Sequence, residues 1–355
     1  MLYFGLNKLG KISTFPLSFK EVDMLTFLWY YIYSDSYIYK SLYKAKEIAM
    51  GNVFYFGWEA DLMIWIQAHI NDFMVNLSNS ISFLGEDLVY IFIMGLFFWC
   101  IDKRKGVLIG TILTVSGIAF AGIKNIACRR RPYMDIEGIK CLRPVEPEAD
   151  IMDLAAQGYS FPSGHSANAA AVYGSLAYFV KKPWAKVVGI GIPLLIGFSR
   201  VILGNHFPTD VLVGWAIGVI VLFAVPAIAD RVKSESRAAL ILCVVCGFGW
   251  FYCKTNDFYT FHGMMCGLLA GAFFEKKYVK FEMPKKWYFW VTRLMGGFAV
   301  YFILYTVLKL PFSSELLASA TYAQFIIRFF RYAIILFVEA GIYPMLFKLE
   351  KKFGK

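Results

Sequence analysis

Charged side chains are scarce in this sequence: Asp, Glu, Lys and Arg make up only 17% of its 355 residues, whereas 59% are hydrophobic. A soluble domain is about a quarter charged and about half apolar. The apolar excess extends over most of the chain, which is far more than a buried core requires. The composition therefore argues against an ordinary soluble domain. It predicts an all-α fold, a polytopic bundle of transmembrane helices.

Metal-ligand patterns are also lacking, because Asp and Glu do not gather at metal-binding spacing. We therefore expect no metal ion and no cofactor. Most cysteines lie in or beside apolar segments, where Cys is usually a small hydrophobe, and Cys243 and Cys246 belong to this group. Cys128 and Cys141 flank a polar loop. They either pair, if that loop faces an oxidising compartment, or stay free.

Long apolar runs are missing from residues 1–49, where the best one, 25–33, is too short to cross a bilayer. We interpret 1–49 as an N-terminal extension that is either dispensable or an interfacial arm. Residues 50–230 are expected to form the functional core, and 231–355 to add further transmembrane helices.

Apolar runs and short polar loops alternate through the rest of the chain. Residues 55–70, with the amphipathic side chains Tyr55, Trp58 and Trp65, are expected at the membrane interface. The candidate spans are 84–101, 106–123, 166–180, 185–203, 209–229, 236–253, 258–274, 288–308 and 325–347.

The net charge of +11 would suggest nucleic-acid binding in a soluble chain. Here most Lys and Arg lie in short loops between apolar runs, as the positive-inside rule places them, so we expect no nucleic-acid partner. The basic loops, among them 103–105, 181–186 and 276–286, fall on one side if every span crosses, and that side should be cytoplasmic. The opposite loop 124–165 is also basic, which an anionic substrate would explain.

Three polar patches interrupt the apolar background, and the first contains Lys124 and Arg131. These residues are seven apart, two helical turns, so both can point the same way. Pro132 predicts that the helix ends near Arg131. Taken alone, this patch is more typical of basic side chains that reach lipid head groups.

The second patch, Pro162-Ser163-Gly164-His165, stands directly before an apolar helix. The free N–H groups and dipole of a helix start bind phosphate, Ser163 adds a hydroxyl donor, and Gly164 lets an anion approach the backbone. His165 is placed to pass a proton to a leaving group. An ordinary helix cap beside a histidine explains this patch equally well when it is taken alone.

The third patch is Ser199-Arg200, followed by His206 and Asp210. His206 and Asp210 are one turn apart, so the carboxylate can accept from one ring nitrogen and leave the other as a nucleophile. Arg200 ends the preceding span and can face the same pocket. The alternative is an Arg–Asp pair that closes a helix hairpin. All three patches emerge on one membrane face in the expected topology, and their joint occurrence favours a functional site.

Together the patches resemble the tripartite signature of the type-2 phosphatidic acid phosphatase superfamily. That signature is Lys, six residues, Arg-Pro; Pro-Ser-Gly-His; and Ser-Arg, five residues, His, three residues, Asp. Every spacing is intact here, and the resemblance covers about residues 80–230. It implies a six-helix membrane core, with His206 as nucleophile, Asp210 orienting it and His165 as proton donor. The phosphate ligands that it implies are Lys124, Arg131, Ser163, Gly164 and Arg200.

The implied reaction is metal-independent hydrolysis of a lipid phosphate or diphosphate at the extracytoplasmic face of the cell membrane. Phosphatidic acid, phosphatidylglycerol phosphate, polyprenyl diphosphate and a sphingoid-base phosphate all remain open as substrates. A lipid phosphotransferase would carry the same motifs. An anion-binding transporter is a hypothesis from a different class and predicts no hydrolysis. A vanadate haloperoxidase uses a related site, but it is normally soluble.

Overall fold

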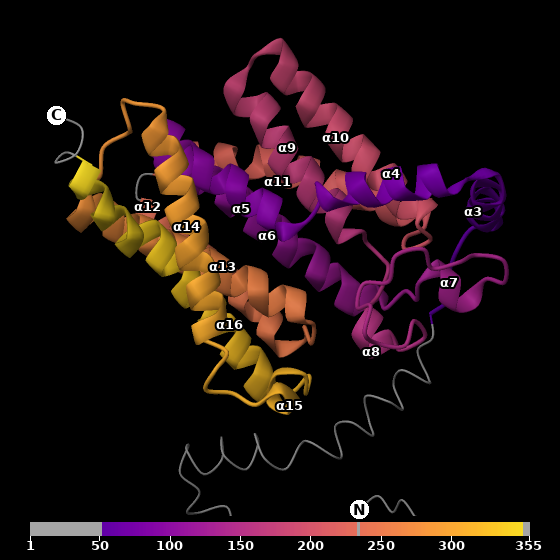
Figure 1. The fold of residues 1–355 in the computed structure, drawn as a ribbon. Helices are drawn as coiled ribbons and strands as arrows, with labels where there is room; N and C mark the ends of the chain where they lie inside the picture. Colours follow the sequence, from indigo (N-terminus) through magenta and orange to yellow (C-terminus); the bar gives the residue numbers. More distant parts are fainter. Residues whose placement is uncertain (1–51, 233–234, 351–355) are drawn as a thin grey trace, which may run out of the picture. The chain divides into compact units, whose positions relative to one another are not determined.

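The computed structural model describes residues 52–232 and 235–350 (Figure 1). The hypotheses about residues 1–49 lie outside these ranges. The described part contains helices and no strand, so the all-α prediction is confirmed. Its α-helices are α3 (Gly57–His69), α4 (Asp72–Phe83), α5 (Asp87–Leu96), α6 (Lys103–Ala127), α7 (Pro132–Asp135), α8 (Leu154–Gln157), α9 (Gly164–Val180), α10 (Pro183–Ile202), α11 (Pro208–Arg231), α12 (Glu235–Gly247), α13 (Asn256–Phe274), α14 (Tyr288–Val307), α15 (Ser314–Leu317) and α16 (Tyr322–Phe337).

Several helices continue into turns of different pitch. Three π-helical turns follow α5, α13 and α16, at Phe97–Ile101, Glu275–Val279 and Val338–Ile342. Two 3₁₀ turns lie at Phe248–Phe251 and Tyr343–Leu349.

Each of the nine expected spans falls on a helix, but fewer meet the length and hydropathy of a bilayer span. Within the described residues α6, α10, α11 and α14 do so, and α4 with α5 adds a fifth if that pair, bent by 43°, is one span. The helices α9, α13 and α16 are shorter or less apolar. In α9 the difference from a bilayer span has a physical reason. Its buried face carries small side chains, such as Ala167 and Ala171, that let neighbouring helices approach closely.

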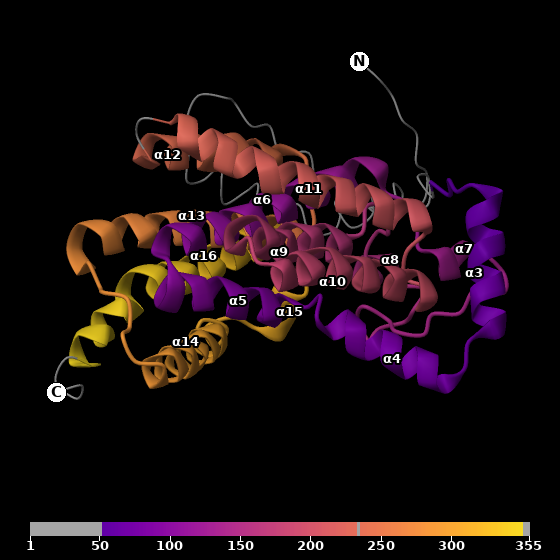
Figure 2. The same ribbon diagram turned by 90° about the horizontal axis from the view of Figure 1, so that it is seen from above.

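Helix α6 lies between two groups of helices (Figures 1 and 2). It packs against α9 and α11 on one flank and against α13 on the other, while α10 covers α9 and α16 covers α13. Gly214 and Gly218 bring α11 against α9, because a Cβ at these positions would collide with the carbonyl oxygens of Ser163 and Ala167. This close packing fixes the start of α9 beside the start of α11.

The two ends of the bundle differ in their side chains. At one end, ion pairs join the start of α6 to the π-helical turn after α13 and to the end of α11: Lys103 Nζ lies 2.6 Å from Glu275 Oε1, and Arg104 Nη2 lies 2.7 Å from Asp230 Oδ1. Lys103 and Arg104 belong to the basic segment 103–105 noted in the sequence. The opposite end holds the end of α6, the starts of α9 and α11, and the end of α10, where the three polar patches lie.

Candidate active site

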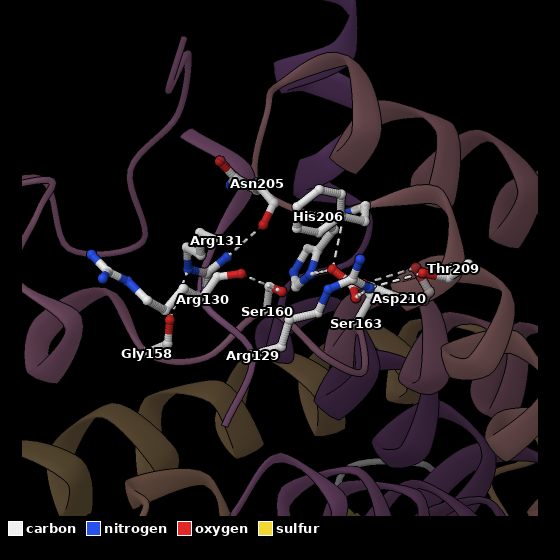
Figure 3. Close-up of polar contacts among 12 residues, drawn as sticks. Arg129, Arg130, Arg131, Gly158, Ser160, Ser163, Asn205, His206, Thr209 and Asp210 are labelled. Carbon is white, nitrogen blue, oxygen red and sulfur yellow. Dashed lines mark hydrogen bonds and ion pairs between the residues drawn. The ribbon is translucent and has the colours of Figure 1, made fainter. Parts of the chain in front are cut away.

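A backbone hydrogen bond joins the second and third patches, and a bond from a side chain to a backbone carbonyl joins the first patch to the third. The N–H of Ser163 donates to the carbonyl of Asp210 at 3.0 Å, and the N–H of His206 donates to the carbonyl of Arg200 at 3.3 Å. Arg131 Nη1 donates to the carbonyl of Asn205 at 3.0 Å (Figure 3). Side chains that are 86 positions apart in the chain, from Lys124 to Asp210, therefore belong to one constellation.

The path of the chain between Lys124 and Arg131 differs from the sequence prediction. Helix α6 ends at Ala127, and Cys128 adopts a left-handed conformation with φ of 49°. The two cations therefore do not share a helix face, and the prediction based on two helical turns was wrong. They reach the same site because the chain turns at Cys128 and continues in extended form to Arg131.

His206 and Asp210 form the pair that the sequence suggested. His206 lies in the loop between α10 and α11, and its Nδ1 is 3.5 Å from Asp210 Oδ2 (Figure 3). This nitrogen is buried and has no hydrogen-bond partner among the described residues, so Asp210 is the group that it faces. Catalytic hydrogen bonds are often long before substrate binds. The geometry leaves Nε2 as the nitrogen available for attack.

The environment of His206 favours the neutral imidazole. Burial lowers the pKa of His206 well below its usual range, and the nearby positive charges, that of Arg131 foremost, lower it further. A neutral ring has a free lone pair, which an imidazolium does not. His206 is therefore in the form that a nucleophile needs near neutral pH.

Arg131 and Arg200 are buried cations with neutral oxygen partners. Arg131 Nε donates to the carbonyls of Gln157 and Gly158 at 2.9 and 3.0 Å. Arg200 Nη1 donates to the hydroxyl of Ser82 at 2.7 Å. Carbonyl and hydroxyl oxygens orient a guanidinium without cancelling its charge. Both charges therefore remain available to an anion.

Ser163 and Gly164 form the start of α9, as the sequence predicted. Ser163 is the N-cap, and its hydroxyl oxygen accepts from the N–H and the hydroxyl of Ser166 at 3.4 and 2.9 Å. A hydroxyl has two acceptor positions and one donor, so the Ser163 proton is left to donate. A Cβ at Gly164 would lie 2.9 Å from the ring of Phe120, so glycine fits this tight corner.

His165 and Lys124 each lie beside a carboxylate. His165 Nε2 is 3.5 Å from Glu86 Oε1, at the bend between α4 and α5. Lys124 Nζ is 3.8 Å from Asp257 Oδ2, at the start of α13. The second contact brings a residue from beyond the motif region to the site.

Arg129 and Glu59 are the residues that sequence reasoning missed. Arg129 donates to Asp210 Oδ1 at 2.7 Å (Figure 3). It also donates to Glu59 Oε2 at 3.0 Å, and all three side chains are buried. Glu59 Oε1 also accepts from the N–H and the hydroxyl of Thr209 at 2.9 and 2.6 Å. The only signal in the sequence was a carboxylate, Glu59, in the midst of an aromatic interfacial segment.

Three arginines of the basic loop 124–165 pair with carboxylates of the protein itself. Arg129 is paired with two carboxylates, Arg130 lies 3.4 Å from Asp135, and Arg143 lies 2.7 Å from Glu86. The charges of these three arginines are therefore at least partly compensated within the protein. Cys128 and Cys141 are free thiols in the structure, so the alternative of a disulfide between them is not realised.

The fold and the site are those of a helical integral membrane protein. Two family models match the chain: "PAP2 superfamily" over residues 105–234 and "PAP2 superfamily phosphatase, transmembrane extension" over residues 259–352. Together they cover more than half of the sequence. The chain belongs to the PAP2 superfamily, and its C-terminal helices are the transmembrane extension found in that superfamily.

Curated relatives are similar over parts of the chain. Phosphatidylglycerophosphatase B of Bacillus subtilis (strain 168) is 44% identical over 85 residues, which are 21% of this chain and 41% of the relative. Undecaprenyl-diphosphatase of Sulfolobus acidocaldarius is 28% identical over 156 residues, 42% of this chain and 66% of the relative. Lipid A 1-phosphatase of Porphyromonas gingivalis is 39% identical over 64 residues, 18% of this chain and 14% of the relative. The chain thus matches less than two thirds of each relative's length.

A solved structure is also similar, the transmembrane PAP2-type phosphatidylglycerolphosphate phosphatase from Bacillus subtilis. The match has 26% identity and a TM-score of 0.38 and covers 57% of this chain and 98% of that one.

Proposed function

We propose that the chain is a membrane-embedded lipid phosphatase that works through a phosphohistidine at His206. The observation that carries the proposal is the meeting of a buried, neutral His206 with two buried arginines, Arg131 and Arg200, whose partners are neutral oxygens. A nucleophile that faces uncompensated positive charge suits an electrophile with anionic oxygens. A phosphate ester is such a group.

The first step joins His206 Nε2 to phosphorus and breaks the bond between phosphorus and the leaving oxygen. Asp210 beside Nδ1 holds the ring and stabilises the positive charge that develops on it. His165 gives its proton to the leaving oxygen. In the second step water attacks the phosphohistidine, His165 takes a proton from it, and inorganic phosphate leaves with His206 restored.

The remaining site residues supply the positioning and charge neutralisation that phosphoryl transfer requires. Arg131, Arg200 and Lys124 neutralise the phosphate oxygens, while the Ser163 hydroxyl and the Gly164 N–H donate to them at the start of α9. These donors are fixed before the substrate arrives, because backbone carbonyls and neighbouring helix ends hold them. We infer no role for a metal ion in this scheme.

The substrate that we propose is a lipid phosphate or diphosphate. The names of the relatives specify phosphatidylglycerophosphate, undecaprenyl diphosphate and lipid A 1-phosphate, all of them amphiphiles. The site lies where several helices end, which suits a head group at the membrane interface. Because the basic loops gather at the opposite end of the bundle, we propose that the site faces away from the cytoplasm.

Phosphate release from a panel of lipid phosphates in detergent, with EDTA present, tests the proposal. We expect release by the intact protein and by Arg104→Gln, a matched change at the opposite end, but none by His206→Ala. Release that survives His206→Ala would refute the nucleophile. Loss in EDTA would refute the metal-free scheme, and phosphate that appears on a lipid alcohol would identify a phosphotransferase.

A further inference from the structure

We propose that Glu86 is the positioning residue of His165, a counterpart to Asp210 beside His206. It would hold the ring so that Nδ1 donates to the leaving oxygen, and it would balance the charge of the imidazolium. The inference rests on the proposed phosphatase function. It assigns to Glu86, which lies outside the three motifs, a part in the first chemical step.

The bend between α4 and α5 places Glu86 at the site. Helix α4 ends at Phe83, α5 begins at Asp87, and the two are bent by 43°. Glu86 is the N-cap residue of α5, and its Oε1 lies 3.5 Å from His165 Nε2. A Cβ at Gly85 would lie 3.1 Å from His165 Cδ2, so the glycine lets the bend pack against the ring.

Arg143 binds the same oxygen of the Glu86 carboxylate that faces His165. Its Nη2 donates to Glu86 Oε1 at 2.7 Å, and its Nη1 donates to the carbonyl of Asn79 at 3.0 Å. The side chain of Asn205, the neighbour of His206, donates to the Arg143 carbonyl at 2.8 Å. The carboxylate is thus fixed relative to both histidines. Arg143 also offsets a negative charge that would otherwise repel a phosphate.

The contacts of the ring decide which nitrogen of His165 can act. Nε2 is closed to solvent and has no hydrogen-bond partner among the described residues, so the group it faces is Glu86. Cδ2 lies against Gly85, whereas the side chain as a whole is 29% exposed. The open edge of the ring is therefore the one with Nδ1.

The proton balance follows from this orientation. The imidazolium carries protons on Nδ1 and Nε2. When the bond from phosphorus to the leaving oxygen breaks, its electron pair goes to that oxygen, which takes the Nδ1 proton. The neutral ring keeps Nε2–H, directed at Glu86. Attack by water on the phosphohistidine returns a proton to Nδ1.

The surrounding charges explain why His165 needs a carboxylate. Burial, together with the charges of Arg200 from α10 and Lys124 from α6, lowers the pKa of His165 to about 4, and Glu86 acts in the opposite direction by favouring the cationic ring. Arg143 and His206, each from a loop, also lie near this pair, as do Asp87 and Tyr90 of α5.

A comparison of leaving groups tests the role. 4-Nitrophenol leaves without a proton donor, whereas an alkyl alcohol needs one. In Glu86→Gln, which keeps the size of the side chain, we expect kcat/KM to fall about 100-fold for an alkyl phosphate and about threefold or less for 4-nitrophenyl phosphate. Glu86→Asp should recover part of the loss. Glu148→Gln changes an exposed carboxylate in the loop between α7 and α8, which also carries Arg143, and it should match the intact protein on both esters.

Glu86→Gln in a His165→Asn background distinguishes an effect that acts through His165 from a general effect on the structure. We expect Glu86→Gln to add no further loss there, because its effect passes through the histidine. Equal losses on both esters, or a full additional loss in the His165→Asn background, would overturn the proposal. If the intact protein cleaves neither ester, the phosphatase function itself fails. If it cleaves both and Glu86→Gln behaves like Glu148→Gln, only the role of Glu86 fails.

Discussion

Arg129 Nη1 lies 2.7 Å from Asp210 Oδ1, on the carboxylate whose other oxygen faces His206. The same guanidinium reaches Glu59 Oε2 at 3.0 Å, and its carbon lies 3.8 Å from the centre of the Phe207 ring. The Phe207 N–H in turn donates to Asp210 Oδ2 at 2.8 Å. One buried side chain thus connects the proposed catalytic pair to helix α3.

Replacement of Arg129 should impair catalysis through Asp210. We expect Arg129→Met to lower kcat by about 100-fold, because a small displacement of an orienting group has an effect of this size. Arg129→Lys should recover little, since a single ammonium cannot reach both carboxylates as the guanidinium does. The measurement is phosphate release by protein shown to be folded by gel filtration.

Arg130→Met is the matched control for this prediction. Arg130 is adjacent in sequence, but its Nε lies 3.4 Å from Asp135 and its side chain is 30% exposed. We expect a change in kcat of about threefold or less, since partly exposed ion pairs contribute little and this one joins Arg130 to Asp135 and not to Asp210. A loss in Arg130→Met as large as in Arg129→Met would show that the effect is not specific to the contact with Asp210.

Glu59 should make the fold sensitive to acid. Burial raises the pKa of Glu59, but hydrogen bonds from Thr209 and Phe56 and the charge of Arg129 outweigh burial, so the pKa lies below its usual range. Its ionisation therefore stabilises the fold above the pKa of an unfolded Glu, about 4.3, and this contribution is lost as the pH falls through the folded-state pKa. In detergent, Glu59→Gln should unfold at a lower temperature than the intact protein at pH 7, and the gap should narrow as the pH falls below about 4.

Asp61→Asn, on the same helix, is the control for Glu59. Asp61 is exposed, so its replacement should leave the unfolding temperature unchanged at both pH values. A gap between Glu59→Gln and the intact protein that stays constant with pH would contradict an ionised Glu59 in the folded state.

Asp257 should lower the affinity of the Lys124 ammonium for phosphate. Asp257 belongs to α13, in the C-terminal extension, and its Oδ2 lies 3.8 Å from Lys124 Nζ. In Asp257→Asn the ammonium loses a competing anion. We expect inorganic phosphate to inhibit this variant at a concentration about two- to fivefold lower, as for a pair in partial contact with water. Asp230→Asn, whose carboxylate pairs with Arg104 at the opposite end, should not change the inhibition constant. If inorganic phosphate inhibits Asp257→Asn more weakly than it inhibits the intact protein, the prediction is wrong.

Removal of residues 1–49 should leave activity close to that of the full chain. All the proposed catalytic and phosphate-binding residues lie between Lys124 and Asp210, and the supporting residue Glu59 also follows the deletion. The measurement is kcat/KM of the shortened protein in detergent. A loss of about tenfold or more in folded protein would assign the N-terminal segment a part in function.

The sequence predicted the class of fold because the hydrophobic effect depends on how many apolar residues a segment contains. Long apolar runs can satisfy their backbone groups in a bilayer only as helices or closed barrels, and runs of this length indicate helices. It also predicted the helix start at Ser163 and Gly164, since helix capping depends on local backbone chemistry. Local rules failed after Ala127, where the left-handed Cys128 ends α6 four residues early.

The partners of the charged side chains required the tertiary structure. Three arginines in succession look alike in sequence, yet Arg129 and Arg131 are buried while the side chain of Arg130 is 30% exposed. Alternation of this kind follows from the extended backbone beyond Cys128. Arg129 contacts carboxylates whereas Arg131 contacts carbonyls, and this difference depends on the helix ends that lie opposite each of them. The carboxylates of Glu59 and Glu86 lie outside the three motifs.

The sequence by itself determined that this is a helical membrane protein and which motif residues its proposed active site contains, because apolar length and motif spacing are properties of the chain alone. The tertiary structure decided what surrounds each of them. It placed Asp210 against Arg129, His165 against Glu86 and Lys124 against Asp257. These contacts arise where separate helices end side by side, and their distances depend on packing that no local pattern encodes.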